Sequence, residues 1–74
     1  MDRLSHQDIS QSIAALDERI VQGECRLTTQ RGRVATLEHA GEDSSASRDL
    51  LHYIEEGLAL RYQLRARLLW KLRG

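Results

Sequence analysis

The chain has 74 residues, with eleven basic and eleven acidic side chains, so its formal net charge is zero. Neutrality removes any overall electrostatic reason to expect a nucleic-acid partner, and a single cysteine excludes a disulfide within the chain. A chain this short buries too little apolar surface to be comfortably stable alone, which favours oligomerisation.

The first element begins with a helix-start signal. Ser5 followed by Asp8 is a capping-box-like pair, and Leu4 and Ile9 can close a hydrophobic staple around it. No proline follows, and helix-forming residues are abundant. We expect a helix over about residues 6–40.

The apolar residues of this helix recur at heptad spacing, which is typical of a helix that pairs with another along a narrow stripe. The positions are Ile9, Ile13, Leu16, Ile20, Gly23, Leu27, Gln30, Val34 and Leu37. One flank carries Arg19, Arg26 and Arg33, and the other carries Asp17, Glu24, Arg31 and Glu38. Gly23 and Gln30 interrupt the stripe. Gly23 either admits a bulky neighbour from the facing helix or breaks the segment into two helices.

The stretch LEHAGEDSSASRDLL, residues 37–51, separates two helical patterns. His39 suits the negative end of a helix, and Gly41 suits the left-handed residue just beyond it. Asp43 or one of the two serines after it can cap a new helix. A stop followed so soon by a start predicts a corner over residues 41–45, with antiparallel helices on either side.

The second helix, over about residues 46–73, has apolar residues around more than half its circumference. They are Leu50, Leu51, Tyr53, Ile54, Leu58, Leu60, Tyr62, Leu64, Leu68, Leu69 and Leu72. One facing helix cannot cover so wide an arc, so the sequence predicts an all-α antiparallel hairpin that dimerises into a four-helix bundle. We also expect the first helix to be longer by about nine residues, or about 14 Å, leaving Leu4, Ile9 and Ile13 overhanging.

The residues predicted for the core and the dimer contact are Ile9, Ile13, Leu16, Ile20, Leu27, Val34, Leu37, Leu50, Ile54, Leu58, Leu64 and Leu68. Arg61 and Arg65 fall inside the apolar arc of the second helix. Charges there are costly unless paired, so we expect a buried or half-buried network with Glu24 that fixes the register. The alternatives are a pocket for an anionic ligand, or arginine stems that extend past the core into water.

The second helix ends in a basic segment, which gives an alternative function as a binder of nucleic acid or of an anionic membrane. The residues that would carry it are Arg61, Arg65, Arg67, Lys71 and Arg73. The competing interpretation is that this segment lies against Asp17, Glu18 and Glu24 and is neutralised there. Trp70, Arg67 and Lys71 are the candidate contacts for a partner protein, because tryptophan is enriched at interface hot spots.

A second alternative is a metal-binding bundle, because Asp49 and His52 are spaced as ligands are in di-iron bundles and Glu38 is expected across the corner. Both residues project away from the apolar arc, which favours a solvated end of the bundle instead. Cys25 takes an outward position and carries no sign of reactivity. The sequence shows no nucleophile–base pair or phosphate loop, so we expect a non-enzymatic cytoplasmic protein without a cofactor, a metal or a membrane span.

Residues 30–69 resemble a group of small uncharacterised bacterial proteins found in rhizobia and their relatives. The shared features are Gln30-Arg31, Leu37 with Gly41 and Asp43, Ser44-Ser45, Leu50-Leu51, and Arg65 with Leu68-Leu69. The resemblance implies a helical hairpin of bacterial origin and implies no activity. Together with the helix pattern, it leads us to expect a protein-interaction or regulatory adaptor that acts by helix pairing and homodimerisation.

Overall fold

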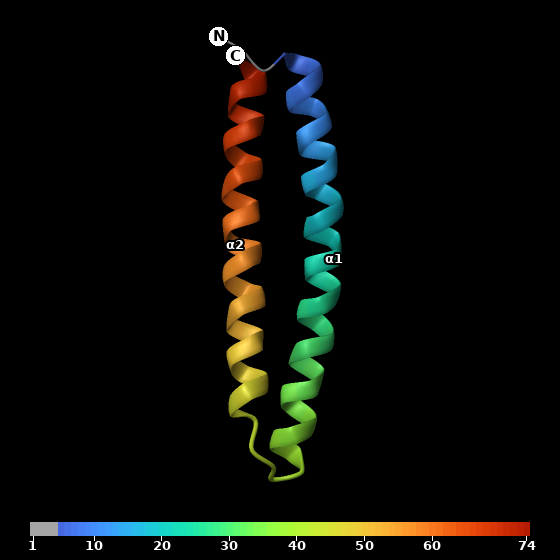
Figure 1. Ribbon diagram of the computed structural model, residues 1–74, viewed down its shortest axis with the longest axis vertical. Coiled ribbons are helices and arrows are strands. Elements are labelled where there is room, and N and C mark those ends of the chain that lie inside the picture. The colour runs from blue at the N-terminus through green and yellow to red at the C-terminus, as the bar shows by residue number, and fades with distance from the viewer. Residues whose placement is uncertain (1–4) are drawn as a thin grey trace.

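Two antiparallel α-helices make up the fold. The computed structural model describes residues 5–74, in which α1 spans His6–His39 and α2 spans Ser45–Arg73. The corner lies at one end of a rod measuring 56 × 17 × 17 Å, and the start of α1 and the end of α2 lie together at the other (Figure 1). The predicted all-α hairpin is confirmed, with helix bounds within about one residue of those expected.

Both ends of α1 are closed by the predicted signals. Ser5 Oγ accepts a hydrogen bond from Asp8 N at 3.0 Å, and Asp8 Oδ2 accepts one from Ser5 N at 3.3 Å. At the far end, Glu42 N donates to Leu37 O at 2.8 Å, and Gly41 adopts a φ of 70°. This is a Schellman-type stop that requires a residue tolerant of left-handed backbone. The predicted staple at Leu4 lies outside the described residues.

Asp43 organises the entry into α2. Its Oδ1 accepts hydrogen bonds from Ser45 N at 2.9 Å and from Ser45 Oγ at 2.6 Å. These two bonds, the side-chain one first, hold the pKa of Asp43 below its ordinary value because they favour the charged carboxylate. Ser44 occupies the cap position without a side-chain hydrogen bond. The turn is therefore held by local bonds at both of its ends.

Burial follows heptad spacing on both helices. All nine predicted stripe positions of α1 are buried or half-buried. The matching stripe of α2 is also buried or half-buried, and it consists of Ser47, Leu51, Ile54, Leu58, Arg61, Arg65, Leu68 and Leu72. Each helix thus presents one narrow stripe to the other, as in coiled-coil-like packing.

Gly23 and Leu58 form the tightest part of the interface. A Cβ placed on Gly23 would lie 2.8 Å from Leu58 Cδ2, and Leu58 is the most buried core residue, with only 3% of its surface exposed. Leu16, Ile20 and Ile54 complete the cluster around it. The glycine admits a bulky neighbour, and α1 runs through it without a break.

Gln30, the polar residue that interrupts the apolar stripe of α1, is buried in the helix interface. Only 4% of its surface is exposed, and its Nε2 donates to the backbone oxygen of Ser47 on α2 at 2.8 Å. A buried side-chain amide must be satisfied to avoid a desolvation cost, and this bond satisfies it across the helix pair. The interruption in the apolar stripe is therefore a polar cross-link that favours one register.

The expected overhang of α1 is wrong. α1 has 34 residues and α2 has 29, so the difference is smaller than predicted. Ile9 is only 5% exposed and Ile13 is half-buried in the single hairpin. The corner turns back early enough for the C-terminal turns of α2 to cover both residues, so no second chain is needed there.

Candidate interaction surface

The two long edges of the hairpin differ. Along one edge, called here the closed edge, side chains of α1 spaced seven residues apart each bond to α2. The four pairs are Asp17–Arg65 at 2.5 Å, Glu24–Tyr62 at 2.8 Å, Arg31–Glu55 at 3.7 Å, and Glu38–Arg48. These pairs are at least partly exposed, so each contributes modestly to stability. Together they pair the polar side chains of the two helices along this edge.

The closed edge also shifts two pKa values. Tyr62 donates its hydroxyl to Glu24, which raises the tyrosine pKa because ionisation would remove the proton that makes this hydrogen bond. The Arg65 guanidinium donates to Asp17, which raises the arginine pKa by stabilising the cation. Both side chains are therefore held in their ordinary neutral-pH forms.

The predicted network of Arg61, Arg65 and Glu24 is wrong in its pairing, although both arginines are half-buried as expected. Arg65 pairs with Asp17, while Glu24 is exposed and bonds to Tyr62. Arg65 and Asp17 are both about half-exposed, so their charges stay in contact with water. The arginine stems fill the stripe while the charged ends reach out of it, which is the second of the two alternatives named above.

The opposite edge, called here the open edge, carries a second apolar stripe on α2. It consists of Leu50, Tyr53, Gly57, Leu60 and Leu64, again at heptad spacing. The four large side chains are exposed, and Leu60 has 66% of its surface in contact with water. A heptad stripe that no helix covers within residues 5–74 is the main unmatched feature of this surface.

The part of α1 that borders the open edge is basic. Arg19, Arg26 and Arg33 follow one another at seven-residue intervals, and within residues 5–74 none of them lies within 4 Å of a carboxylate. Each borders a shallow hollow between the two helices. The open edge thus combines an uncovered apolar stripe with a row of arginines that no acid of the described chain neutralises.

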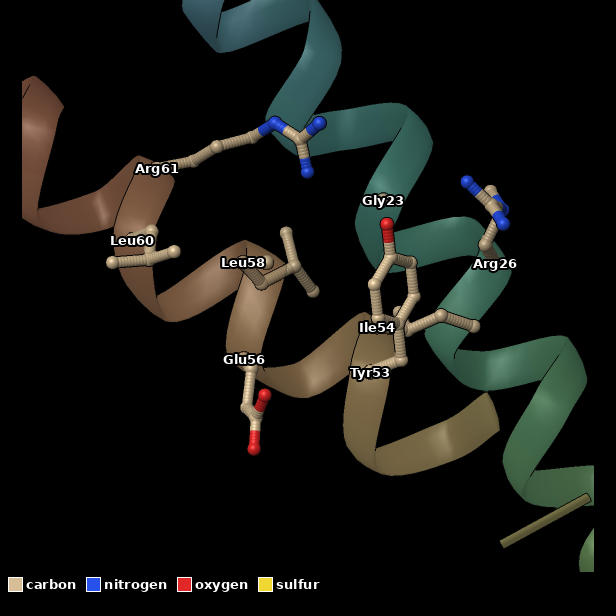
Figure 2. A pocket seen from close by; sticks show the side chains of 9 residues that line it. Gly23, Arg26, Tyr53, Ile54, Glu56, Leu58, Leu60 and Arg61 are labelled. Carbon is tan, nitrogen blue, oxygen red and sulfur yellow. The ribbon is translucent and has the colours of Figure 1, made fainter. Parts of the chain in front are cut away.

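The central hollow shows how the two rows meet. Gly23 and Arg26 of α1 line it together with Tyr53, Leu60 and Arg61 of α2 (Figure 2). Gly57 also lines it, and the side chain of Leu58 lies over Gly23. The hollow is open and shallow, which suits the side chains of another helix better than an enclosed small molecule.

The predicted core residues divide between the two stripes. Ile9, Leu16, Ile20, Val34, Ile54 and Leu58 are buried; Ile13, Leu27, Leu37 and Leu68 are half-buried; Leu50 and Leu64 are exposed on the open edge. Trp70, Arg67 and Lys71 are exposed near the end of α2. Cys25 is exposed, as its outward position predicted.

The residues considered for a metal do not assemble. Glu38 is engaged by Arg48, and His52 Nδ1 lies 3.3 Å from Glu55 Oε1. Within residues 5–74, no three His, Cys, Asp or Glu side chains come together as a set of ligands. The side chains of Glu38 and His52 thus face other partners in the hairpin and do not form the ligand pair that the spacing suggested.

Sequence reasoning missed the Glu24–Tyr62 bond and the role of Gln30. The seven-residue spacing of Asp17, Glu24, Arg31 and Glu38 signalled a shared flank, and Tyr62 was assigned only to the apolar arc. The phenol hydroxyl is a hydrogen-bond donor, so it can serve an acid across the pair as a cation would.

Comparison with known protein families, with characterised proteins and with solved structures finds no significant match to this chain. Among the described residues, neither helix has a run apolar and long enough to cross a bilayer. The surface itself therefore has to carry any functional argument.

Proposed function

We propose that this chain is a non-enzymatic helix-pairing module, an interaction or regulatory adaptor that works by docking its open edge against further helices and that forms a homodimer in doing so. The observation that carries the proposal is the second heptad stripe, Leu50 to Leu64, left uncovered by α1. Such a stripe becomes stable when another helix packs into it.

The surface area supports the same proposal. The hairpin exposes 6013 Å², whereas a compact folded chain of its 8.5 kDa would expose about 4,700 Å². The excess is about 1,300 Å² per chain, more than the roughly 800 Å² that each partner buries in a standard protein interface. An elongated two-helix rod has surface to spare for a partner, and little core of its own.

Paired substitutions test the proposal. Leu60→Gln places an amide on the open edge, where 66% of the leucine is exposed in the single hairpin, so the hairpin itself should still fold. Val21→Gln is the matched control, because Val21 is 58% exposed and borders none of the three hollows. We expect Leu60→Gln to weaken self-association about tenfold or more, and Val21→Gln to leave it unchanged.

Light scattering after size exclusion, over a range of chain concentrations, measures this effect. Circular dichroism of each variant checks that helix content is retained. Equal association of the two variants would remove the open edge from the account and leave the proposed function without its support.

A further inference from the structure

The open edge also specifies how a second copy would dock. Asp49 and Glu56 are seven residues apart on α2, so they lie on the same side of that helix. Glu56 borders the central hollow together with Arg26 (Figure 2). Among the described residues, neither acid lies within 4 Å of a cationic group. The open face therefore runs from unpaired arginines on α1, across the apolar stripe, to unpaired acids on α2.

The two rows are also at matching heights along the rod. Gly23 lies at the same position along the rod as Leu58. Because the helices are antiparallel, moving one residue towards the C-terminus of α1 corresponds to moving one residue towards the N-terminus of α2. Counting from that contact puts Arg26 level with residue 55, beside Glu56, and Arg33 level with residue 48, beside Asp49. A basic row and an acidic row with the same spacing and the same height stand on opposite sides of one stripe.

Two copies that meet face to face can be related by a twofold axis along the helices or across them. An axis along the helices sets α1 of each copy beside α2 of the other and leaves the position of each residue along the rod unchanged. The arginine row then faces the acidic row of the second copy. An axis across the helices sets α1 on α1, so arginine faces arginine at a cost in free energy.

We propose that the open edge binds a second copy of this chain through a twofold axis parallel to the helices, with Arg26 and Arg33 facing Glu56 and Asp49 of the other copy and both corners at the same end. This arrangement rests on the proposed function, since it requires that the homodimer forms. Every neighbouring pair of helices in the resulting bundle is antiparallel, and Gly57 lets the second copy approach the apolar stripe closely.

Spin labels at the corner distinguish the two axes. In the variant Cys25→Ser/Glu42→Cys, each chain carries one label at the corner, where Glu42 is exposed. With corners at the same end, the interlabel distance by double electron–electron resonance should be well under half the 56 Å length of the hairpin. With corners at opposite ends, it should approach that length. The variant Cys25→Ser/Val21→Cys carries its label near the middle of the rod and away from the three hollows, so its interlabel distance should differ far less between the two arrangements and serves as the control.

Charge reversal gives an independent test. Arg26→Glu and Glu56→Arg should each weaken dimerisation by about tenfold, because each removes two exposed ion pairs per dimer and brings like charges together. The double variant Arg26→Glu/Glu56→Arg should recover the wild-type affinity.

A dimer with a long corner-to-corner distance, or a double variant no tighter than its parents, would overturn the arrangement and leave the homodimer intact. A chain that stays single at every concentration would instead overturn the proposed function. The two failures are thus separable in one set of samples.

Discussion

At the scale of single residues, Gly23 has the largest structural effect for its size. Its missing side chain makes the space into which Leu58 inserts, and Leu58 is the best-buried residue of the core. A glycine within a helix costs about 1 kcal/mol relative to alanine. Here that cost is offset because the two helices approach closely at the centre of the rod.

Gly23→Ala and Gly32→Ala form a matched pair. Both remove a helical glycine, but a Cβ at position 32 would meet nothing within 4 Å, whereas one at position 23 would lie 2.8 Å from Leu58 Cδ2. We expect Gly32→Ala to raise the free energy of unfolding by about 1 kcal/mol. Gly23→Ala should lower it by about 1 kcal/mol, because overpacking of about 1–3 kcal/mol exceeds the gain in helix propensity.

Urea unfolding at one fixed chain concentration measures both changes. If Gly23→Ala were as stabilising as Gly32→Ala, the close approach of the two helices at this layer would be wrong.

Other single residues were harder to predict from the sequence. The apolar stripe of α1 was readable because its spacing is regular, and the small residue at position 23 correctly indicated a large neighbour. Gln30 was read as an interruption because its partner is a backbone oxygen of Ser47, which no sequence pattern marks. The sequence predicts Glu24 as the partner of Arg65, whereas the structure pairs Arg65 with Asp17. The axial position of Arg65 relative to α1 depends on the geometry of the corner, which residue spacing alone does not fix.

At the scale of elements, the corner determines which residues face each other. Gly41 and Asp43 close it with local hydrogen bonds, and Ser44 is buried. The start and stop signals therefore predicted the helix bounds well. They did not predict the register. Arg65 pairs with Asp17 and not with Glu24, which is seven residues or about two helical turns away, and the expected overhang of Ile9 and Ile13 is absent.

The acid stability of the corner should depend on Asp43. Its folded pKa lies below the ordinary value of 3.8, so its bonds to Ser45 add stability above that pH and lose it as the pH falls through the folded pKa. Asp43→Asn keeps an acceptor for Ser45 without the charge. We expect the variant to be less stable than the wild type at neutral pH, and the two stabilities to converge as the pH falls below 3.8. Chemical unfolding at a series of pH values measures it, and identical acid declines would contradict the role given to Asp43.

At the scale of the whole molecule, the asymmetry of the two edges is the central feature. The closed edge matches its charges across the helix pair, whereas the open edge leaves Arg26, Glu56 and the stripe around Leu60 without partners in the described chain. The sequence predicted the excess apolar surface of α2, since its arc exceeded what one helix covers. It did not reveal which edge stays open, because that depends on the register of α1 against α2.

Sedimentation equilibrium of the wild-type chain, from low to high micromolar concentration, tests the account most directly. We predict a particle of twice the 8.5 kDa chain mass that dissociates on dilution. A fully helical species of single-chain mass at every concentration would contradict the claim that the open edge is an interface.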